Sequence, residues 1–168
     1  MKLQKILNQF LRLHPKEIDL SLNRIKRLTK ALGSPQNKLK IISIVGTNGK
    51  GSTAQTIRSI LEEAQYKCDL YTSPHVQKIN ERFVFAGNEI SDNKLCNLLE
   101  EVEKVNNKKP ITYFEILTAA FFLGASRSNS DLTILESGLF HRFDACSDIR
   151  ENLASVITAI GLDHLDWL

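Results

Sequence analysis

Cysteine and long apolar runs are both scarce in this sequence, and each scarcity excludes a class of protein. The three cysteines, Cys68, Cys96 and Cys146, are widely spaced, odd in number and form no Cys-x-x-Cys pair. That pattern excludes a disulfide framework and a structural zinc knot, and it favours a reducing cytoplasm. The longest apolar stretch, around residues 119–123, is far shorter than the roughly 20 residues of a membrane span. We therefore expect no membrane partner, and the amphipathic N-terminus does not resemble a signal peptide.

An excess of one charge is also missing. The 22 Lys and Arg residues against 19 Asp and Glu leave a formal net charge of +3, spread along the chain without a basic block. A nucleic-acid partner is therefore not expected. The hydrophobic content of 42% is ordinary for a globular protein, and 168 residues suit one α/β domain.

Hydrophobic periodicity predicts helices that alternate with short strands rich in β-branched residues. Helices are expected over residues 2–12, 19–32, 52–64, 91–106 and 112–125, with Asp19, Ser91 and Thr112 as helix-capping residues. Strands are expected over residues 38–45, 67–72, 132–136 and 155–160, and residues 73–89 are expected to be irregular. This order predicts an α/β fold with a mainly parallel sheet and flanking helices. The third helix should bury Ile57, Ile60, Leu61 and Ala64.

The strongest chemical signal is the segment GTNGKGST, Gly46 to Thr53, between a predicted strand and a predicted helix. Glycines let a loop turn its N–H groups around a phosphate, and the helix N-terminus adds free donors and a favourable dipole. The general P-loop pattern is broken twice, because Ile44 replaces its first glycine and Gly51 replaces the Ser or Thr after the lysine. The alternative is a glycine-rich turn without a ligand.

The form GTNGKGS resembles the loop of the Mur-ligase superfamily, and in particular that of the folylpolyglutamate and dihydrofolate synthases. Further segments resemble the same family in the same order, namely DLSLNR (19–24), YTSPH (71–75), INER (79–82), TYFE (112–115) and IGLDH (160–164). The resemblance implies a P-loop NTPase-like fold in which residues 1–168 form the N-terminal part of the ATP-binding domain. The resemblance also implies that the family's C-terminal glutamate-ligase domain would lie outside this chain. The chain ends a few residues past the fourth predicted strand, so we expect it to be part of a larger enzyme.

The resemblance also implies an activity. Such an enzyme would be an ATP-dependent ligase that adds L-glutamate to dihydropteroate or to folates. The γ-phosphate of ATP would move to the substrate carboxylate, and the glutamate amine would attack the resulting acyl phosphate. The partners would be these small molecules together with Mg²⁺, and the full-length enzyme would be a cytoplasmic monomer.

The family's nucleotide and metal residues can be carried over onto matching positions. ATP would be bound by Asn48, Gly49, Lys50, Gly51, Ser52 and Thr53. The metal would be bound by Ser73, Glu136 and His164, and catalysis would fall to Lys50, Glu136 and His164. Residue chemistry independently supports Glu136, because a carboxylate at the carboxyl end of a buried strand faces the ligand crevice and suits Mg²⁺. By itself, Ser73 would be interpreted as a turn residue and His164 as a loop histidine.

The substrate residues implied in the same way are Tyr113, Phe114, Glu115, Arg142, Phe143, Asp144 and Ala145. Glu115 has a second explanation, because Thr112-x-x-Glu115 is also a capping box at a helix start. Phe140-His141 stands where the family has a Gly-Gly pair, which predicts a different path for the loop before Phe143.

Two other functions remain open at this stage. One is a non-catalytic nucleotide-binding remnant, which the short chain and Phe140-His141 would suit. The other is a Mur-type ligase acting on cell-wall precursors, against which the YTSPH and INER segments argue. A kinase or GTPase is disfavoured, because Gly51 removes the usual magnesium-binding hydroxyl.

Overall fold

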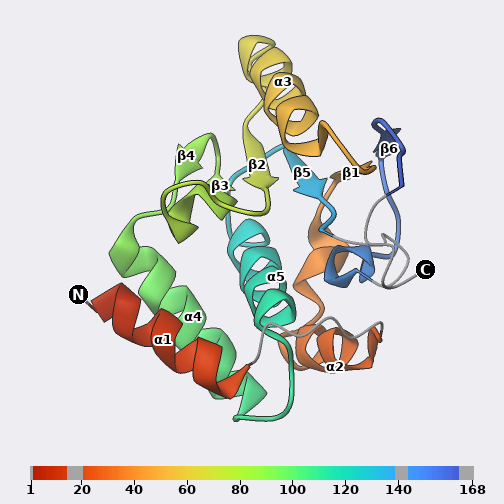
Figure 1. Ribbon diagram of the computed structural model, residues 1–168. Coiled ribbons are helices and arrows are strands. Elements are labelled where there is room, and N and C mark those ends of the chain that lie inside the picture. Colours follow the sequence, from red (N-terminus) through yellow and green to blue (C-terminus); the bar gives the residue numbers. More distant parts are fainter. Residues whose placement is uncertain (1, 15–20, 139–143, 163–168) are drawn as a thin grey trace.

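The computed structural model describes residues 2–14, 21–138 and 144–162, which form one sheet with helices on both faces (Figure 1). The α-helices are α1 (Lys2–Leu13), α2 (Asn23–Ala31), α3 (Lys50–Glu63), α4 (Asp92–Asn106) and α5 (Tyr113–Ala125). The strands are β1 (Ile41–Val45), β2 (Cys68–Tyr71), β3 (Phe83–Phe85), β4 (Asn88–Glu89), β5 (Leu132–Glu136) and β6 (Ala154–Ile157). Short 3₁₀ turns are η1 (Pro35–Lys38), η2 (Ile79–Arg82) and η4 (Ala145–Ser147).

The sheet has six strands in the order β4-β3-β2-β5-β1-β6. Strands β2, β5, β1 and β6 are parallel, as expected from the alternation of strands and helices. Strand β1 lies between β5 and β6, so the loop that follows β1 emerges at the middle of the parallel part. That position is where open α/β sheets bind ligands.

The two faces of the sheet bury cores of different size. Helix α3 covers one face over a small cluster that includes Ile44, Leu70 and Ile134. The other face is covered by α5, against which α2 and α4 pack, with α1 outside α4 (Figure 1). This larger core is rich in aromatic residues, and Phe121 of α5 stacks on Tyr71 of β2 with ring centroids 4.8 Å apart. The three cysteines are free and buried in these cores, so they act as small apolar residues.

Residues 73–89 were predicted to be irregular, and this was wrong from Ile79 onward. This segment holds the turn η2 and an antiparallel hairpin, β3 and β4, which extends the sheet beyond β2. The strands are only three and two residues long, too short for a period-two pattern to be recognised. They form because Val84 and Phe83 pair with Leu70 and Tyr71 of β2, a tertiary contact that local sequence does not encode.

The starts of α2 and β1 and the burial of residues in α3 also differ from the prediction. Helix α2 begins at Asn23, and Asp19 lies outside the described residues. Residues 35–38 form a 3₁₀ turn, so strand β1 begins only at Ile41. In α3 only Ala54 is fully buried, while Ile60 is 63% exposed, because a single face of this helix meets the sheet. None of the described helices combines the length and apolar character needed to cross a membrane.

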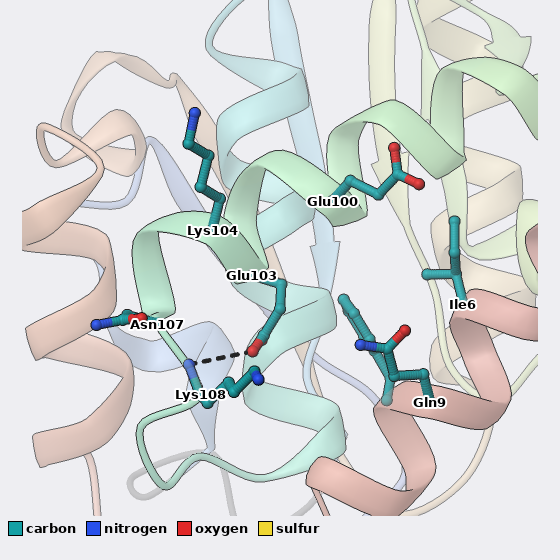
Figure 2. Close-up of a pocket in the computed structure, with 8 residues that line it drawn as sticks. Ile6, Gln9, Glu100, Glu103, Lys104, Asn107 and Lys108 are labelled. Carbon is teal, nitrogen blue, oxygen red and sulfur yellow. Dashed lines mark hydrogen bonds between the residues drawn. The ribbon is translucent and has the colours of Figure 1, made fainter.

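A hollow of about 340 Å³ is lined by residues of α1 and α4 and of the turn after α4 (Figure 2). These two helices lie away from the carboxyl ends of the parallel strands (Figure 1). The lining of the hollow carries charges of both signs, including Glu103, Lys104 and Lys108. Glu103 accepts hydrogen bonds from the Lys108 N–H at 3.2 Å and pairs with the buried His14 at 2.8 Å. These contacts join the end of α1 to the end of α4, so this region stabilises the helical layer.

Candidate nucleotide and metal site

The glycine-rich loop leaves β1 at Val45 and enters α3 at Lys50, as the sequence predicted. Gly46 has φ +139°, and a Cβ there would lie 2.1 Å from the Thr158 hydroxyl oxygen. Gly49, the residue before the helix, has φ +81°. Residues that carry a Cβ rarely adopt these backbone angles. Both positions therefore require glycine if the chain is to turn from β1 into α3.

The loop leaves a set of backbone donors open. The N–H groups of Thr47 and Asn48 both donate to the Ala159 carbonyl, at 2.8 and 3.3 Å. Thr53 makes the first helical hydrogen bond, to the Gly49 carbonyl, so the N–H groups of Lys50, Gly51 and Ser52 have no partner within the helix. Such a cluster at a helix N-terminus is an anion site. Within the predicted loop, the Asn48 N–H is therefore already used and the helix start supplies the donors.

The side chain of Lys50 bends back over the glycine-rich loop that precedes α3. Its Nζ donates to the carbonyls of Gly46 and Thr47, at 2.8 and 3.2 Å. These contacts hold the ammonium group beside the open donors without engaging it in an ion pair among the described residues.

Glu136 lies opposite the start of α3. It ends β5, in register with Ile44 of β1, and its side chain is 4% exposed. Its Oε2 accepts a hydrogen bond from the Ser73 N–H at 3.0 Å, and both carboxylate oxygens lie 3.7 Å from where a Gly51 Cβ would stand. The structure thus brings together Gly51, Ser73 and Glu136, three residues that the sequence predicted as one site.

The electrostatics of Glu136 suit a cation. Burial raises the pKa of its carboxyl, and the Ser73 N–H and the charges of Lys50 and Arg82 offset only part of that rise. A divalent ion would compensate this buried charge, and Mg²⁺ is commonly held by one or two carboxylates together with phosphates and water. Residues 2–14, 21–138 and 144–162 contain no group of three or more His, Cys, Asp or Glu suited to a metal. His164, the remaining predicted ligand, lies outside the described residues.

A cleft of about 760 Å³ opens beside these groups. Its lining includes Gly49, Gly51, Ser52, Arg58, Ser73, Glu81, Gly87 and Glu136. Arg58 of α3 holds the hairpin turn in place, because its Nη2 donates to the Gly87 carbonyl at 2.7 Å. The unpredicted hairpin is thus one wall of the cleft.

Glu81, in the INER segment, organises the loop that follows Ser73. Its carboxylate accepts hydrogen bonds from the N–H groups of Val76, Gln77 and Lys78, at 2.8 to 2.9 Å. These bonds lower the pKa of Glu81. The sequence did not predict this role, and the only local signal was a carboxylate seven residues after Pro74.

The predicted substrate residues divide into two groups around α5. Glu115 closes the expected capping box, since its carboxylate accepts from the Thr112 N–H at 2.7 Å and its N–H donates to the Thr112 hydroxyl at 3.2 Å. The same carboxylate oxygen pairs with Arg24 of α2 at 2.9 Å, while Oε1 is buried without a hydrogen bond. Tyr113 is largely buried beside it.

The second group meets at Gly138. A Cβ on Gly138 would lie 3.0 Å from the Phe114 ring and 2.9 Å from the Asp144 carboxylate, so these two side chains converge there. Asp144 also caps η4 by accepting from the Cys146 N–H at 2.8 Å, and Ala145 is buried. Arg142 and Phe143 lie outside the described residues, as does the Phe140-His141 departure.

Sequence and structure comparisons show which known proteins this chain is similar to. No protein-family model matches the chain. A dihydrofolate synthase/folylpolyglutamate synthase of Bacillus subtilis is 41% identical over 155 residues, which cover 88% of this chain and 36% of that protein. Escherichia coli FolC, solved in complex with DHPP and ADP, superposes with a TM-score of 0.91 at 36% identity over 99% of this chain and 40% of its own.

The chain is similar to the dihydrofolate synthase/folylpolyglutamate synthases. The Yersinia pestis bifunctional synthase, complexed with AMPPNP and Mn ion, gives a TM-score of 0.89 at 34% identity over 99% of this chain and 40% of its own. The chain therefore spans about two fifths of the length of these synthases. The predicted fold, an α/β domain of the Mur-ligase type with a mainly parallel sheet, is confirmed.

Proposed function

We propose that this chain supplies the nucleotide and metal site of an ATP-dependent ligase that joins L-glutamate to dihydropteroate or to a folate. The observation that carries the proposal is the placement of a phosphate loop directly opposite a buried, hydrogen-bonded carboxylate, Glu136. The related synthases, one solved with ADP and DHPP and another with AMPPNP and Mn, support the choice of ligands.

In the proposed reaction, the N–H groups at the start of α3 and Lys50 bind the phosphates of ATP. Asn48, Gly49, Gly51, Ser52 and Thr53 complete that loop. Glu136 and Ser73, with His164 as the third predicted ligand, would hold Mg²⁺, which would neutralise charge on the phosphates as the acyl phosphate forms. Most of the rate enhancement would then be electrostatic, supplied by groups already in place before ATP binds.

The pterin side of the substrate would lie along the start of α5 and the turn before η4. We assign to it Tyr113, Phe114, Glu115, Arg142, Phe143, Asp144 and Ala145. Glu115 would act mainly by holding the helix start rigid, because its capping and ion-pair contacts occupy one of its two oxygens. A rigid helix start positions the neighbouring side chains for contact with the substrate.

The remaining assignments follow from the same proposal. Residues 1–168 would be the N-terminal part of a Mur-ligase-type ATP-binding domain, with the glutamate-ligase domain outside this chain. The complete enzyme would act as a cytoplasmic monomer on small molecules, without a nucleic-acid or membrane partner.

Replacing Lys50 tests the proposal in the natural full-length protein. Lys50→Ala should lower ATP-dependent ligation of L-glutamate to dihydropteroate by about a hundredfold or more, because a charge that stabilises the transferring phosphate is lost. Lys94→Ala, on the exposed face of α4, is the matched control and should retain activity. ADP release is the readout, and circular dichroism checks the fold.

Three outcomes are informative. Full ligation by Lys50→Ala would remove this lysine from the mechanism. Binding of ATP without ligation by the unmodified protein would favour a nucleotide-binding remnant. Ligation to a cell-wall precursor but not to dihydropteroate would identify a different Mur-type ligase.

A further inference from the structure

Arg82 of the INER segment bonds to His75 of the YTSPH segment, so these two motifs meet in the folded chain. The Arg82 Nε donates a hydrogen bond to the His75 Nδ1 at 2.9 Å. A guanidinium can only donate, so Nδ1 is the acceptor and the ring proton of the neutral imidazole lies on Nε2. The bond holds the guanidinium through Nε and uses neither of its two Nη groups.

No carboxylate neutralises Arg82 within the part of the chain that the structure describes. Its side chain is half-buried, and its bond to His75 is its one side-chain hydrogen bond there. Arg24, Arg58 and Arg127, by contrast, each pair with a glutamate at 2.6 to 2.9 Å. A half-buried cation loses part of its hydration, and a bound anion compensates for that loss. Two Nη groups match a carboxylate, because they can bind its two oxygens side by side.

On one side, Arg82 is joined to the metal site. His75 is two residues beyond Ser73, and the Ser73 N–H donates to the Glu136 carboxylate at 3.0 Å. Burial raises the pKa of Glu136, and the positive charge of Arg82 offsets part of that rise. Arg82 therefore lies close enough to Glu136 for its charge to act there.

On the other side, Arg82 is joined to the start of α5. The next residue, Phe83, pairs with Tyr71 of β2, and the Tyr71 ring lies 6.2 Å from the ring of Phe114. Burial raises the pKa of Tyr71 and of Tyr113, and in both the charge of Arg82 opposes that rise. The guanidinium thus lies between the end of β5 and the first turn of α5.

We propose that Arg82, held in place by His75, binds the substrate carboxylate that receives the phosphate. The inference rests on the proposed function, in which the γ-phosphate lies beside Glu136 and the pterin lies along the start of α5. The carboxylate of such a substrate must lie between these two places, which is where the guanidinium stands. Arg82 would then select an acid over a neutral ligand of the same shape.

A purely structural role is the alternative. Through His75, Arg82 could simply fasten the turn η2 to the segment that follows Ser73. A structural arginine would affect the binding of every pterin ligand alike. A carboxylate-binding arginine would affect only the ligands that carry the charge, so a pair of matched ligands separates the two roles.

The test compares dihydropteroate with its carboxamide, which is neutral at the position that would receive the phosphate. Dissociation constants are measured by calorimetry on the natural full-length protein with ADP and Mn²⁺ present, so that no phosphate is available for transfer. The variants are Arg82→Gln and Arg82→Lys. Arg127→Gln is the matched control, because Arg127 pairs with Glu101 at the surface beyond the end of α5. Circular dichroism checks the fold of each variant.

In Arg82→Gln, the affinity for dihydropteroate should fall by at least about tenfold, the loss expected for hydrogen bonds to a charged group. Affinity for the carboxamide should stay within about twofold, since it carries no charge for Arg82 to bind. Arg82→Lys keeps the charge but presents a single nitrogen, so the preference for the acid should fall by about threefold or more. This variant decides the question if glutamine prevents folding. Arg127→Gln should behave like the unmodified protein.

The other outcomes overturn the inference in distinguishable ways. Equal weakening of both ligands in Arg82→Gln would make Arg82 a structural residue only. Unchanged binding of both ligands would remove it from the substrate site, and in either case the proposed function would stand. No binding of dihydropteroate by the unmodified protein would overturn the proposed function itself, and this inference with it.

Discussion

At the scale of single residues, the site depends on a carboxylate that burial disfavours. Glu136 is almost fully enclosed, receives one backbone hydrogen bond and has no ion-pair partner at contact distance among the described residues. Burial raises the pKa of its carboxyl, because the charged form loses its contact with water. Proteins retain such groups where a ligand compensates the charge, so stability and metal binding should oppose each other at this position.

Glu136→Gln tests this opposition in metal-free protein. A folded-state pKa raised above the ordinary 4.5 means that ionisation costs stability, and this cost grows as pH rises from about that value through the raised pKa. The variant cannot ionise, so its free energy of unfolding should exceed that of the unmodified protein at pH 7 and converge with it near pH 4. Urea denaturation at several pH values measures the difference.

The same variant should bind Mn²⁺ more weakly by at least about tenfold, because a ligating carboxylate is lost. Glu63→Gln, on the exposed face of α3, is the control and should change neither property. A Glu136→Gln protein that is less stable at neutral pH would contradict the electrostatic account.

At the scale of elements, helix starts differ in how they are capped. At α5, the Thr112 side chain accepts from the Glu115 N–H and Glu115 returns the contact, and an ion pair from Arg24 joins this cap to α2. At α4, Ser91 occupies the capping position, but its side chain makes no capping hydrogen bond. Ser91 and Thr112 both predicted the start of a helix from their residue type. Only Thr112 stabilises its helix start with a side-chain hydrogen bond.

Alanine substitutions at the two positions should therefore differ. Thr112→Ala should lower the free energy of unfolding by about 1 kcal/mol, because a buried helix donor loses its partner. Ser91→Ala should change it by less than about 0.5 kcal/mol. Denaturant titration of both variants measures this, and equal losses would show that the capping bond is not the cause.

At the scale of the whole molecule, the aromatic core joins the sheet to the helical layer. The Phe121 ring lies between strands and helices, with the rings of Tyr71 at 4.8 Å, Phe85 at 5.5 Å and Phe83 at 6.3 Å. Two of these partners belong to the hairpin strand β3. The hairpin that forms one wall of the cleft is thus anchored by the main core.

Phe121→Ala should cost about 3–5 kcal/mol of unfolding free energy, through lost burial and the cavity that remains. Ile60→Ala, on the exposed side of α3, is the control and should stay within about 0.5 kcal/mol of the unmodified protein. Thermal or urea unfolding gives both values. A loss below about 1 kcal/mol at Phe121 would mean that the core closes over the gap.

Local sequence patterns were enough to predict the glycine-rich loop between β1 and α3, the carboxylate at the end of β5, the capping box of α5 and the mainly parallel sheet. Each depends on residues close together in the chain, where glycine angles, capping chemistry and hydrophobic period act locally. The hairpin beside β2, the Ser73 contact to Glu136 across 63 positions and the Thr47 contact to Gly161 across 114 became visible only in the folded chain. These contacts form only when distant segments are brought together by burial of the two cores, and no local pattern records which distant backbone group a side chain will meet.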